Sequence, residues 1–218
     1  MEHKLGLFMM KCKSLEFVKD LIDNYPQLKE CEKSIIDSLN ILISTYENDG
    51  KLLICGNGGS AADSEHIVGE LMKGFILPRK IDQKLEKIIG DSELSSVLQK
   101  GLPAISLVSH TALSTAFAND NLPTAVFAQQ VLVYGKKNDT LLCISTSGNS
   151  KNCVYAAKVA KALGINVISL TGKNVSKLEE LSDLTIKVPF SETYRIQEYH
   201  LPIYHAICLA LENEFFSE

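Results

Sequence analysis

Residues suited to phosphate binding and proton transfer follow one apolar run near residue 54. The run KLLIC leads directly into Gly56, Asn57, Gly58, Gly59 and Ser60. Glycine lets backbone amides approach an anion closely, and a helix that starts here adds the positive end of its dipole. The loop therefore predicts an anion site. A simple strand-to-helix turn with Ser60 as its cap explains the same residues equally well.

A second loop of the same kind follows the apolar run TLLCI. Its residues are Ser145, Thr146, Ser147, Gly148, Asn149 and Ser150. A helix cap needs one hydroxyl group, so four of them indicate a ligand, and we expect both loops to share one phosphate. Neither loop matches the G-x-G-x-x-G pattern of dinucleotide-binding folds or the P-loop pattern of nucleotide triphosphatases. The two loops favour a sugar phosphate.

A histidine and a glutamate, His66 and Glu70, stand four residues apart on the helix predicted after the first loop. Residues at this spacing project from one face of a helix. An exposed ion pair is the ordinary explanation of such a pair. Because these two lie just behind a candidate phosphate loop, we expect them to act on the bound molecule.

The C-terminal segment YRIQEYHLPIYHAICLALENEFF brings together Gln197, Glu198, His200 and His205. One interpretation is an amphipathic packing helix whose polar residues face water. In a continuous helix, Gln197 and His205 lie about 12 Å apart along the axis. They meet one small ligand only if different subunits supply them or if the chain bends at Pro202, where the helix should kink or truly start. This geometry predicts an oligomer with shared sites.

These residues need a scaffold that brings distant segments together. Five apolar runs have the length and continuity of parallel strands covered on both faces: residues 51–56, 103–108, 139–146, 165–172 and 184–189. Helices are predicted between and after them at 60–74, 111–118, 123–134, 149–163, 175–181 and 192–216. The alternation predicts a doubly wound α/β fold in three layers, in which ligands bind beyond the carboxyl ends of the strands.

The remaining segments add helices to this sheet. Residues 8–48 predict an N-terminal helical hairpin that breaks near Pro26, and residues 76–102 predict an exposed helical insertion. No linker or shift in composition divides the 218 residues, so the sequence predicts one domain, 1–218.

Composition excludes several functions. A formal net charge of -4 leaves no broad basic surface for nucleic acid. The N-terminal residues interrupt their apolar run with Lys and Glu, unlike a signal peptide, and no apolar run is long enough to span a bilayer. Six cysteines without a CxxC pair indicate reduced thiols, so we expect a cytoplasmic protein.

Five segments together, GNGGSAADSEH...GE, FAND, STSGNS, SLTG and RIQE...H, resemble the sugar isomerase (SIS) domain proteins, and among them the phosphoheptose isomerase family. The resemblance covers nearly the whole chain apart from residues 76–102. It implies a flavodoxin-like parallel sheet of about five strands. It also implies conversion of sedoheptulose 7-phosphate to a heptose 7-phosphate through a cis-enediol, for nucleotide-activated heptose or surface polysaccharide.

The same resemblance implies a role for each matching residue. Glu70 matches the catalytic base and His205 the catalytic acid. The phosphate is bound by Ser60 and by the second loop through Ser145, Thr146, Ser147 and Ser150. The rest of the substrate site comprises Asn57, Gly58, Gly59, Asn119, Asp120 and Gln197. In some members a zinc ion is bound by His66, Glu70, Gln197 and His205.

The family further implies a homotetramer with active sites between subunits. Two departures bear on the substrate, namely the insertion 76–102 and Tyr194, which stands where those enzymes tend to carry an aspartate. Two other functions stay open. One is a non-catalytic SIS regulator that binds a sugar phosphate or a replication-initiation protein, and the other is an isomerase of another sugar phosphate.

Overall fold

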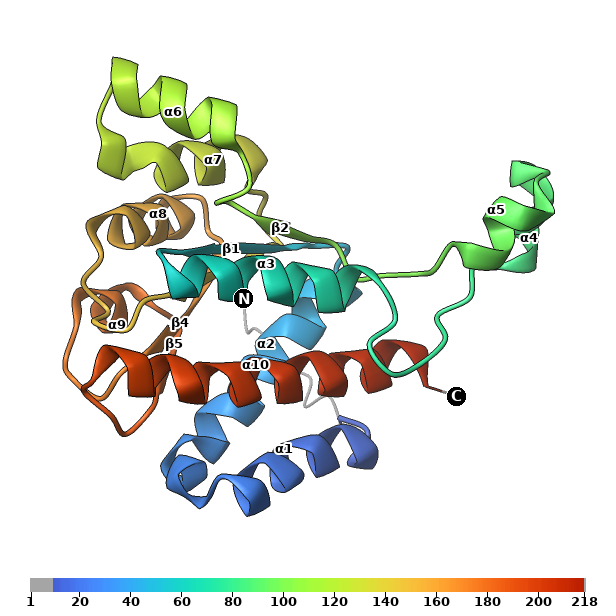
Figure 1. The fold of residues 1–218 in the computed structure, drawn as a ribbon, viewed down its shortest axis with the longest axis horizontal. Helices are drawn as coiled ribbons and strands as arrows, with labels where there is room; N and C mark the ends of the chain where they lie inside the picture. Colours follow the sequence, from blue (N-terminus) through green and yellow to red (C-terminus); the bar gives the residue numbers. More distant parts are fainter. Residues whose placement is uncertain (1–9, 218) are drawn as a thin grey trace, which may run out of the picture.

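Five short parallel strands form one sheet in the computed structural model, which describes residues 10–217 (Figure 1). They are β1 (Leu52–Gly56), β2 (Ala104–Ser106), β3 (Thr140–Ile144), β4 (Asn166–Thr171) and β5 (Leu184–Lys187). Their order across the sheet is β2-β1-β3-β4-β5. This is the flavodoxin-like order. The strands after β1 are added first on one side of it and then on the other, so the topological switch point lies between β1 and β3. The predicted fold class is confirmed, and the two glycine- and serine-rich loops follow the two strands that flank the reversal.

Both faces of the sheet are buried, which explains why the strands read as continuous apolar runs. Along β1, Leu52 and Ile54 belong to the core on one face, whereas Leu53 and Cys55 belong to the core on the other. Successive side chains of a strand point to opposite faces, so each face needs its own apolar set. The strand pattern thus requires helices on both sides.

The helices form two layers around the sheet (Figure 1). One core includes residues of α1 (Cys12–Asn24), α2 (Glu32–Glu47), α3 (Gly59–Met72) and α10 (Thr193–Phe216). The other includes residues of α7 (Val126–Tyr134), α8 (Lys151–Ala162) and α9 (Lys177–Leu181), and Phe117 of α6 (Thr111–Asp120) packs against it. Two 3-10 helices, Pro26–Cys31 and Pro123–Ala125, precede α2 and α7. No helix within residues 10–217 has the length and apolar character needed to cross a membrane.

The long C-terminal helix does not begin at Pro202, as one version of the prediction held. α10 starts at Thr193 and contains Pro202 in its interior, and Figure 1 draws it as one unbroken helix. Proline removes one backbone hydrogen bond from a helix. Here the neighbouring turns bury Ile196, Ile203 and Tyr204, and this packing outweighs the local loss. Gln197 and His205 therefore lie on one continuous helix.

The insertion 76–102 is only partly the exposed decoration that was predicted. Its two short helices, α4 (Gln83–Ile89) and α5 (Ser92–Val97), stand away from the rest of the molecule in Figure 1. At its base, however, Arg79 is 2% exposed, and Ile81 and Leu102 are also buried. The prediction was wrong for these residues because the many charges of the segment indicated an exposed face, and the sequence around Arg79 does not reveal a buried partner elsewhere in the chain.

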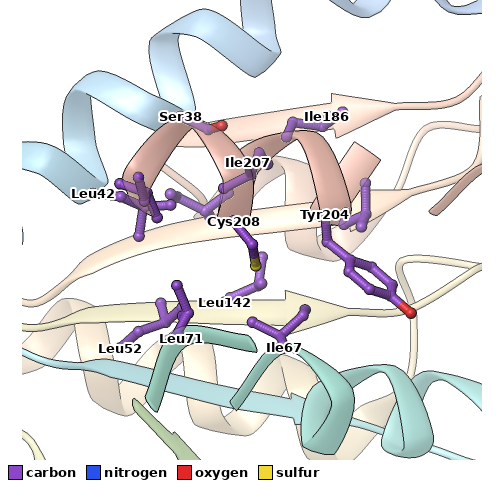
Figure 2. A pocket seen from close by; sticks show the side chains of 13 residues that line it. Ser38, Leu42, Leu52, Ile67, Leu71, Leu142, Ile186, Tyr204, Ile207 and Cys208 are labelled. Carbon is purple, nitrogen blue, oxygen red and sulfur yellow. The ribbon is translucent and has the colours of Figure 1, made fainter. Parts of the chain in front are cut away.

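A small cavity lies in the core between α10, α3 and the sheet (Figure 2). Its volume is about 20 Å³, and apolar side chains such as Leu52, Leu71 and Leu142 line it. A space of this size holds at most about one water molecule. The cavity is a packing gap, so a sugar phosphate must bind elsewhere.

Candidate active site

The first loop is a tight turn between β1 and α3. Gly58 has a φ of 57°, and a side chain at Gly56 would lie 2.4 Å from the backbone oxygen of Ser60. Residues with a Cβ are disfavoured at both positions. The turn aims the start of α3 across the carboxyl edge of the sheet. Ser60, in the first turn of the helix, is 3% exposed.

The second loop follows β3 and is held by its own polar groups. Ser145 Oγ donates to Ser150 Oγ over 3.0 Å, and the backbone NH of Asn149 donates to Ser147 Oγ over 3.1 Å. Gly148 has a φ of 62°. The loop thus places hydroxyl groups and the start of α8 at the same edge as the first loop.

The two loops are joined by a pair of amide side chains. β1 and β3 are direct neighbours, with Gly56 paired to Ile144. Asn57 Nδ2 donates to Asn152 Oδ1 over 3.0 Å, and Asn152 Nδ2 donates to Asn57 Oδ1 over 2.7 Å. The structure therefore brings the two loops together, as expected. Asn152, in the first turn of α8, was not predicted, because its sequence position shows no partner.

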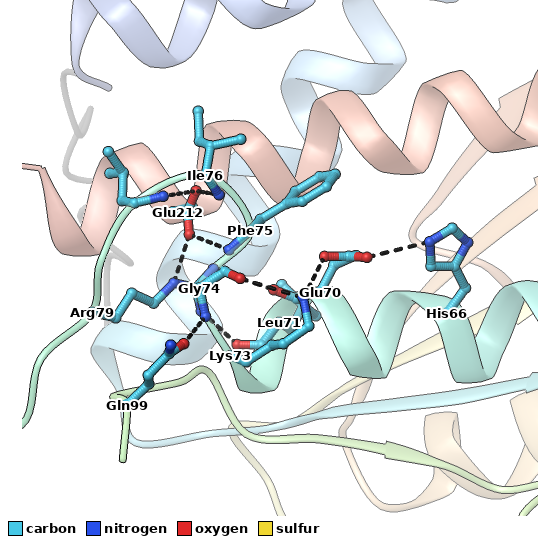
Figure 3. Close-up of polar contacts among 11 residues, drawn as sticks. His66, Glu70, Leu71, Lys73, Gly74, Phe75, Ile76, Arg79, Gln99 and Glu212 are labelled. Carbon is cyan, nitrogen blue, oxygen red and sulfur yellow. Dashed lines mark hydrogen bonds and ion pairs between the residues drawn. The ribbon is translucent and has the colours of Figure 1, made fainter. Parts of the chain in front are cut away.

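The groups suited to proton transfer lie further along α3 and α10. His66 Nε2 and Glu70 Oε1 are 3.3 Å apart, and the His66 and His205 ring centroids are 5.0 Å apart. Lys73 Nζ is 3.3 Å from Glu70 Oε2 (Figure 3). Glu70 is 13% exposed at its side chain. A carboxylate and two imidazoles thus adjoin one another, as the sequence predicted for His66, Glu70 and His205.

Tyr204 and Asp63 form a hydrogen-bonded chain on the Nδ1 side of the His66 ring. Tyr204 Oη donates to Asp63 Oδ1 over 3.2 Å and lies 3.0 Å from His66 Nδ1. Burial raises the pKa of Tyr204 well above its ordinary value, so the hydroxyl keeps its proton. Because the Tyr204 hydroxyl donates to Asp63, its oxygen can accept from Nδ1–H of His66, and this contact fixes the orientation of the ring. Tyr204 precedes His205 in the sequence, yet only the fold shows that it orients the other histidine.

His205 is poised as a neutral imidazole. Burial lowers its pKa, the neighbouring His66 lowers it further, and the Glu70 carboxylate raises it. Its Nε2 atom is buried and has no hydrogen-bond partner among residues 10–217. A neutral imidazole can both accept and donate a proton near neutral pH. A buried ring nitrogen without a hydrogen-bond partner suits a group that binds a substrate or a metal ion.

Gln197 lies apart from these side chains within one protomer. A Cβ at Gly59 would lie 2.6 Å from Gln197 Nε2, so Gln197 packs against the first loop. His205 contacts His66, seven residues further along α3. α3 and α10 therefore run side by side in the same direction, and Gln197 adjoins the phosphate loop rather than Glu70. The structure brings His66, Glu70 and His205 together but leaves Gln197 about two turns away.

Asn119 and Asp120 form the last turn of α6, rather than a loop after a helix that ends at residue 118. Both side chains are exposed, and Asn119 Nδ2 donates to Asp120 Oδ1 over 2.8 Å. α6 lies with α7 over the opposite face of the sheet from α10 (Figure 1). Within one protomer these residues stand apart from Glu70.

The donor types fit zinc, but one protomer does not assemble the whole set. His66 Nε2 faces the Glu70 carboxylate, the His205 ring adjoins that of His66, and imidazole and carboxylate groups are ordinary zinc ligands. No group of three His, Cys, Asp or Glu side chains within residues 10–217 has the arrangement of a metal site. The fourth predicted ligand, Gln197, adjoins Gly59 instead. A complete set requires a second protomer or a movement of side chains.

Comparisons with known proteins give one consistent family. Residues 16–172 match the model of the SIS domain. A phosphoheptose isomerase of Helicobacter pylori strain Shi470 is 42% identical over 188 residues, which cover 86% of this chain and 88% of the relative. The solved phosphoheptose isomerase of Neisseria gonorrhoeae superposes with a TM-score of 0.70 at 32% identity, covering 92% and 94% of the two chains. That of Francisella tularensis gives 0.72 at 30% identity, covering 92% and 98%.

Proposed function

This chain belongs to the SIS-domain family, in its phosphoheptose isomerase branch, and we infer that it interconverts sedoheptulose 7-phosphate and D-glycero-D-manno-heptose 7-phosphate. The product would serve the synthesis of nucleotide-activated heptose or surface polysaccharide. The observation that carries this function is the pairing of two linked hydroxyl-rich loops with an adjoining carboxylate and imidazole. The loops suit the phosphate end of the sugar, and Glu70 and His205 suit its carbonyl end.

The reaction moves two protons and changes no oxidation state overall. Glu70 removes a proton from C1 of the ketose and returns it to C2, and a cis-enediol forms between the two steps. His205 carries the hydroxyl proton from O1 to O2. A positioned acid or base of this kind contributes roughly 10²–10⁴ in rate. Lys73 Nζ lies 3.3 Å from Glu70 Oε2 and forms an ion pair with it.

Phosphate binding aligns the carbon chain for these transfers. Ser60 and the second-loop residues Ser145, Thr146, Ser147 and Ser150 hold the phosphate, together with the backbone of Gly58 and Gly59. Asn57, Gln197, Asn119 and Asp120 contact the sugar hydroxyl groups. Binding energy gained at the phosphate end is then used to orient the reacting carbons.

The distance between the phosphate loop and Glu70 within one protomer favours a site shared by protomers. Glu70 lies ten residues beyond Ser60 on α3, which is about 15 Å along the helix axis. An extended seven-carbon chain with its phosphoester has about eight bonds of ~1.5 Å between C1 and phosphorus, and their zigzag spans only about 10 Å. We therefore propose a homotetramer in which the loops of one protomer face Glu70 and His205 of another. The same arrangement would bring Asn119, Asp120 and Gln197 to the sugar.

Zinc is a further part of the proposal. His66, Glu70 and His205 of one protomer, with Gln197 of a neighbour, would hold the ion. The substrate would partly displace it from Glu70 and His205, since neither group can bind a metal ion tightly and transfer protons at the same time. When bound, it would supply Lewis-acid stabilisation to the oxygen that becomes negatively charged. We also propose a cytoplasmic protein, because five of the six cysteines are buried free thiols.

The test is to incubate the purified protein with sedoheptulose 7-phosphate and follow the aldose product by NMR. Glu70→Gln and His205→Ala should each lower kcat by roughly 10²–10⁴. Glu65→Gln is the matched control, because Glu65 is an exposed carboxylate on the same helix. Equal inactivity of wild type and variants, with binding of sugar phosphate or of a protein partner retained, would support the regulator instead. Turnover of a pentose or hexose phosphate alone would reassign the substrate.

A further inference from the structure

A buried carboxylate on α10 holds the chain just after α3. Glu212 is 0% exposed. Its Oε1 accepts from the backbone NH of Phe75 over 2.7 Å and from Arg79 Nε over 2.8 Å. Its Oε2 accepts from the backbone NH groups of Ile76 and Leu77 over 2.8 and 3.2 Å (Figure 3). One side chain thus fixes three consecutive backbone amides and a guanidinium group.

Arg79 connects Glu212 to the last turn of α3, the helix that contains Glu70. Arg79 Nη1 donates to the carbonyl of Leu71 over 2.6 Å, and Nη2 donates to the carbonyl of Glu70 over 3.2 Å (Figure 3). Both carbonyls belong to the last turn of α3, where helix carbonyls lack partners within the helix. The guanidinium of Arg79 therefore caps the turn that contains Glu70 and joins it to Glu212.

The same network also bears on His205. The segment held by Glu212 begins with Phe75, whose ring centroid is 5.6 Å from that of His205 at an interplanar angle of 60°. Glu212 lies seven residues after His205 on α10, so both project from nearly the same face of the helix. The network around Glu212 thus contacts Glu70 through Arg79 and His205 through Phe75.

We propose that Arg79 and Glu212 are positioning residues that set the placement of Glu70 relative to His205. They contact neither the loops nor the side chains of Glu70 and His205, and they act through the backbone at the end of α3 and through Phe75. This inference rests on the proposed isomerase function. A buried, fully hydrogen-bonded ion pair suits the role, because it has one geometry and cannot exchange partners with water.

The decisive variant is Glu212→Gln, which keeps the shape of the side chain but brings an NH₂ group to a site that faces only donors. The matched control is Asp139→Asn. Asp139 is 2% exposed, and its carboxylate accepts from the backbone NH groups of Lys51 and Lys136 and from Lys51 Nζ. It is an equivalent buried carboxylate just before β3, at the edge of the sheet away from the loops. Arg79→Lys, which keeps the charge but loses the fork, is a second test.

Kinetic constants are measured at a temperature where circular dichroism shows every variant fully folded. We expect Glu212→Gln and Arg79→Lys to lower kcat by roughly 10- to 100-fold, since a misplacement of about 1 Å can cost that much. KM should change less than about twofold, because the loops at the phosphate end stay intact. The double variant should be little worse than either single variant, since the two residues act as a unit. Asp139→Asn should keep wild-type kcat.

A second readout does not depend on activity. The Phe75 ring shifts the ring-proton resonances of His205, so these resonances should move in Glu212→Gln and stay in Asp139→Asn at one fixed pH. If Glu212→Gln and Asp139→Asn both leave kcat and these resonances unchanged, or if they alter them equally, the positioning role is wrong. If the wild type does not isomerise sedoheptulose 7-phosphate, the proposed function fails, while the NMR comparison still decides whether Glu212 places Phe75 against His205.

Discussion

At the scale of single residues, the reciprocal amide pair of Asn57 and Asn152 decides whether the two loops act together. Each amide both donates and accepts, so the pair holds the start of α3 and the start of α8 at a fixed separation. Asn152 touches no predicted catalytic group. Its loss should therefore affect binding of the phosphate more than the chemical step.

We expect Asn152→Ala to raise KM for sedoheptulose 7-phosphate roughly tenfold, which corresponds to the net value of one or two hydrogen bonds. The value of kcat should fall much less. Steady-state kinetics and calorimetric titration with inorganic phosphate measure the two effects. Asn166→Ala, an exposed asparagine at the start of β4, is the control. An unchanged KM would show that the loops keep their separation without the amide pair.

At the scale of elements, α10 contains a buried histidine that makes the fold sensitive to acid. His200 is 0% exposed, and neither ring nitrogen has a hydrogen-bond partner within residues 10–217. Burial lowers its pKa from 6.5 to about 4, although the neighbouring backbone of Thr171 partly opposes this shift. Below pH 6.5, His200 is therefore protonated in the unfolded chain but stays neutral in the folded chain. The contribution of neutral His200 to the free energy of unfolding is fully present above pH 6.5. It is lost progressively as the pH falls towards 4.

Wild type should lose on the order of 3 kcal/mol of unfolding free energy through His200 between pH 7.5 and pH 4. His200→Phe should remove most of this pH dependence, since phenylalanine cannot bind a proton. Urea unfolding at several pH values gives the comparison. His110→Phe, a half-buried histidine at the start of α6, should keep the wild-type dependence. Identical pH profiles for wild type and His200→Phe would exclude His200 as the cause.

At the scale of the whole molecule, a site shared between protomers can be tested by mixing two inactive proteins. One carries Glu70→Gln and the other carries Ser145→Ala with Ser147→Ala. If the loops of one protomer serve the carboxylate of another, random mixed oligomers regain about a quarter of the intact sites. We expect activity to return after the two proteins are unfolded and refolded together. No recovery in verified mixed oligomers would mean that each protomer holds a complete site.

The sequence alone was sufficient for the layered α/β fold, because continuous apolar runs such as KLLIC need a core on both faces. It also identified the two loops and the spacing of His66 and Glu70, since glycine, hydroxyl groups and helical periodicity are local properties. Local patterns misjudged Pro202, which lies inside α10, because the packing of neighbouring turns outweighs a proline's preference.

Only the tertiary structure decided which distant residues meet. The partners Asn57 and Asn152, His66 and Tyr204, and Arg79 and Glu212 are separated by long stretches of chain, and no local pattern couples their positions. The fold also placed Gln197 beside Gly59 and away from Glu70, although both residues belong to one predicted site. Hydrogen bonds of this kind depend on how helices are laid side by side, and that arrangement is set by packing of the whole core rather than by the residues that form the bonds.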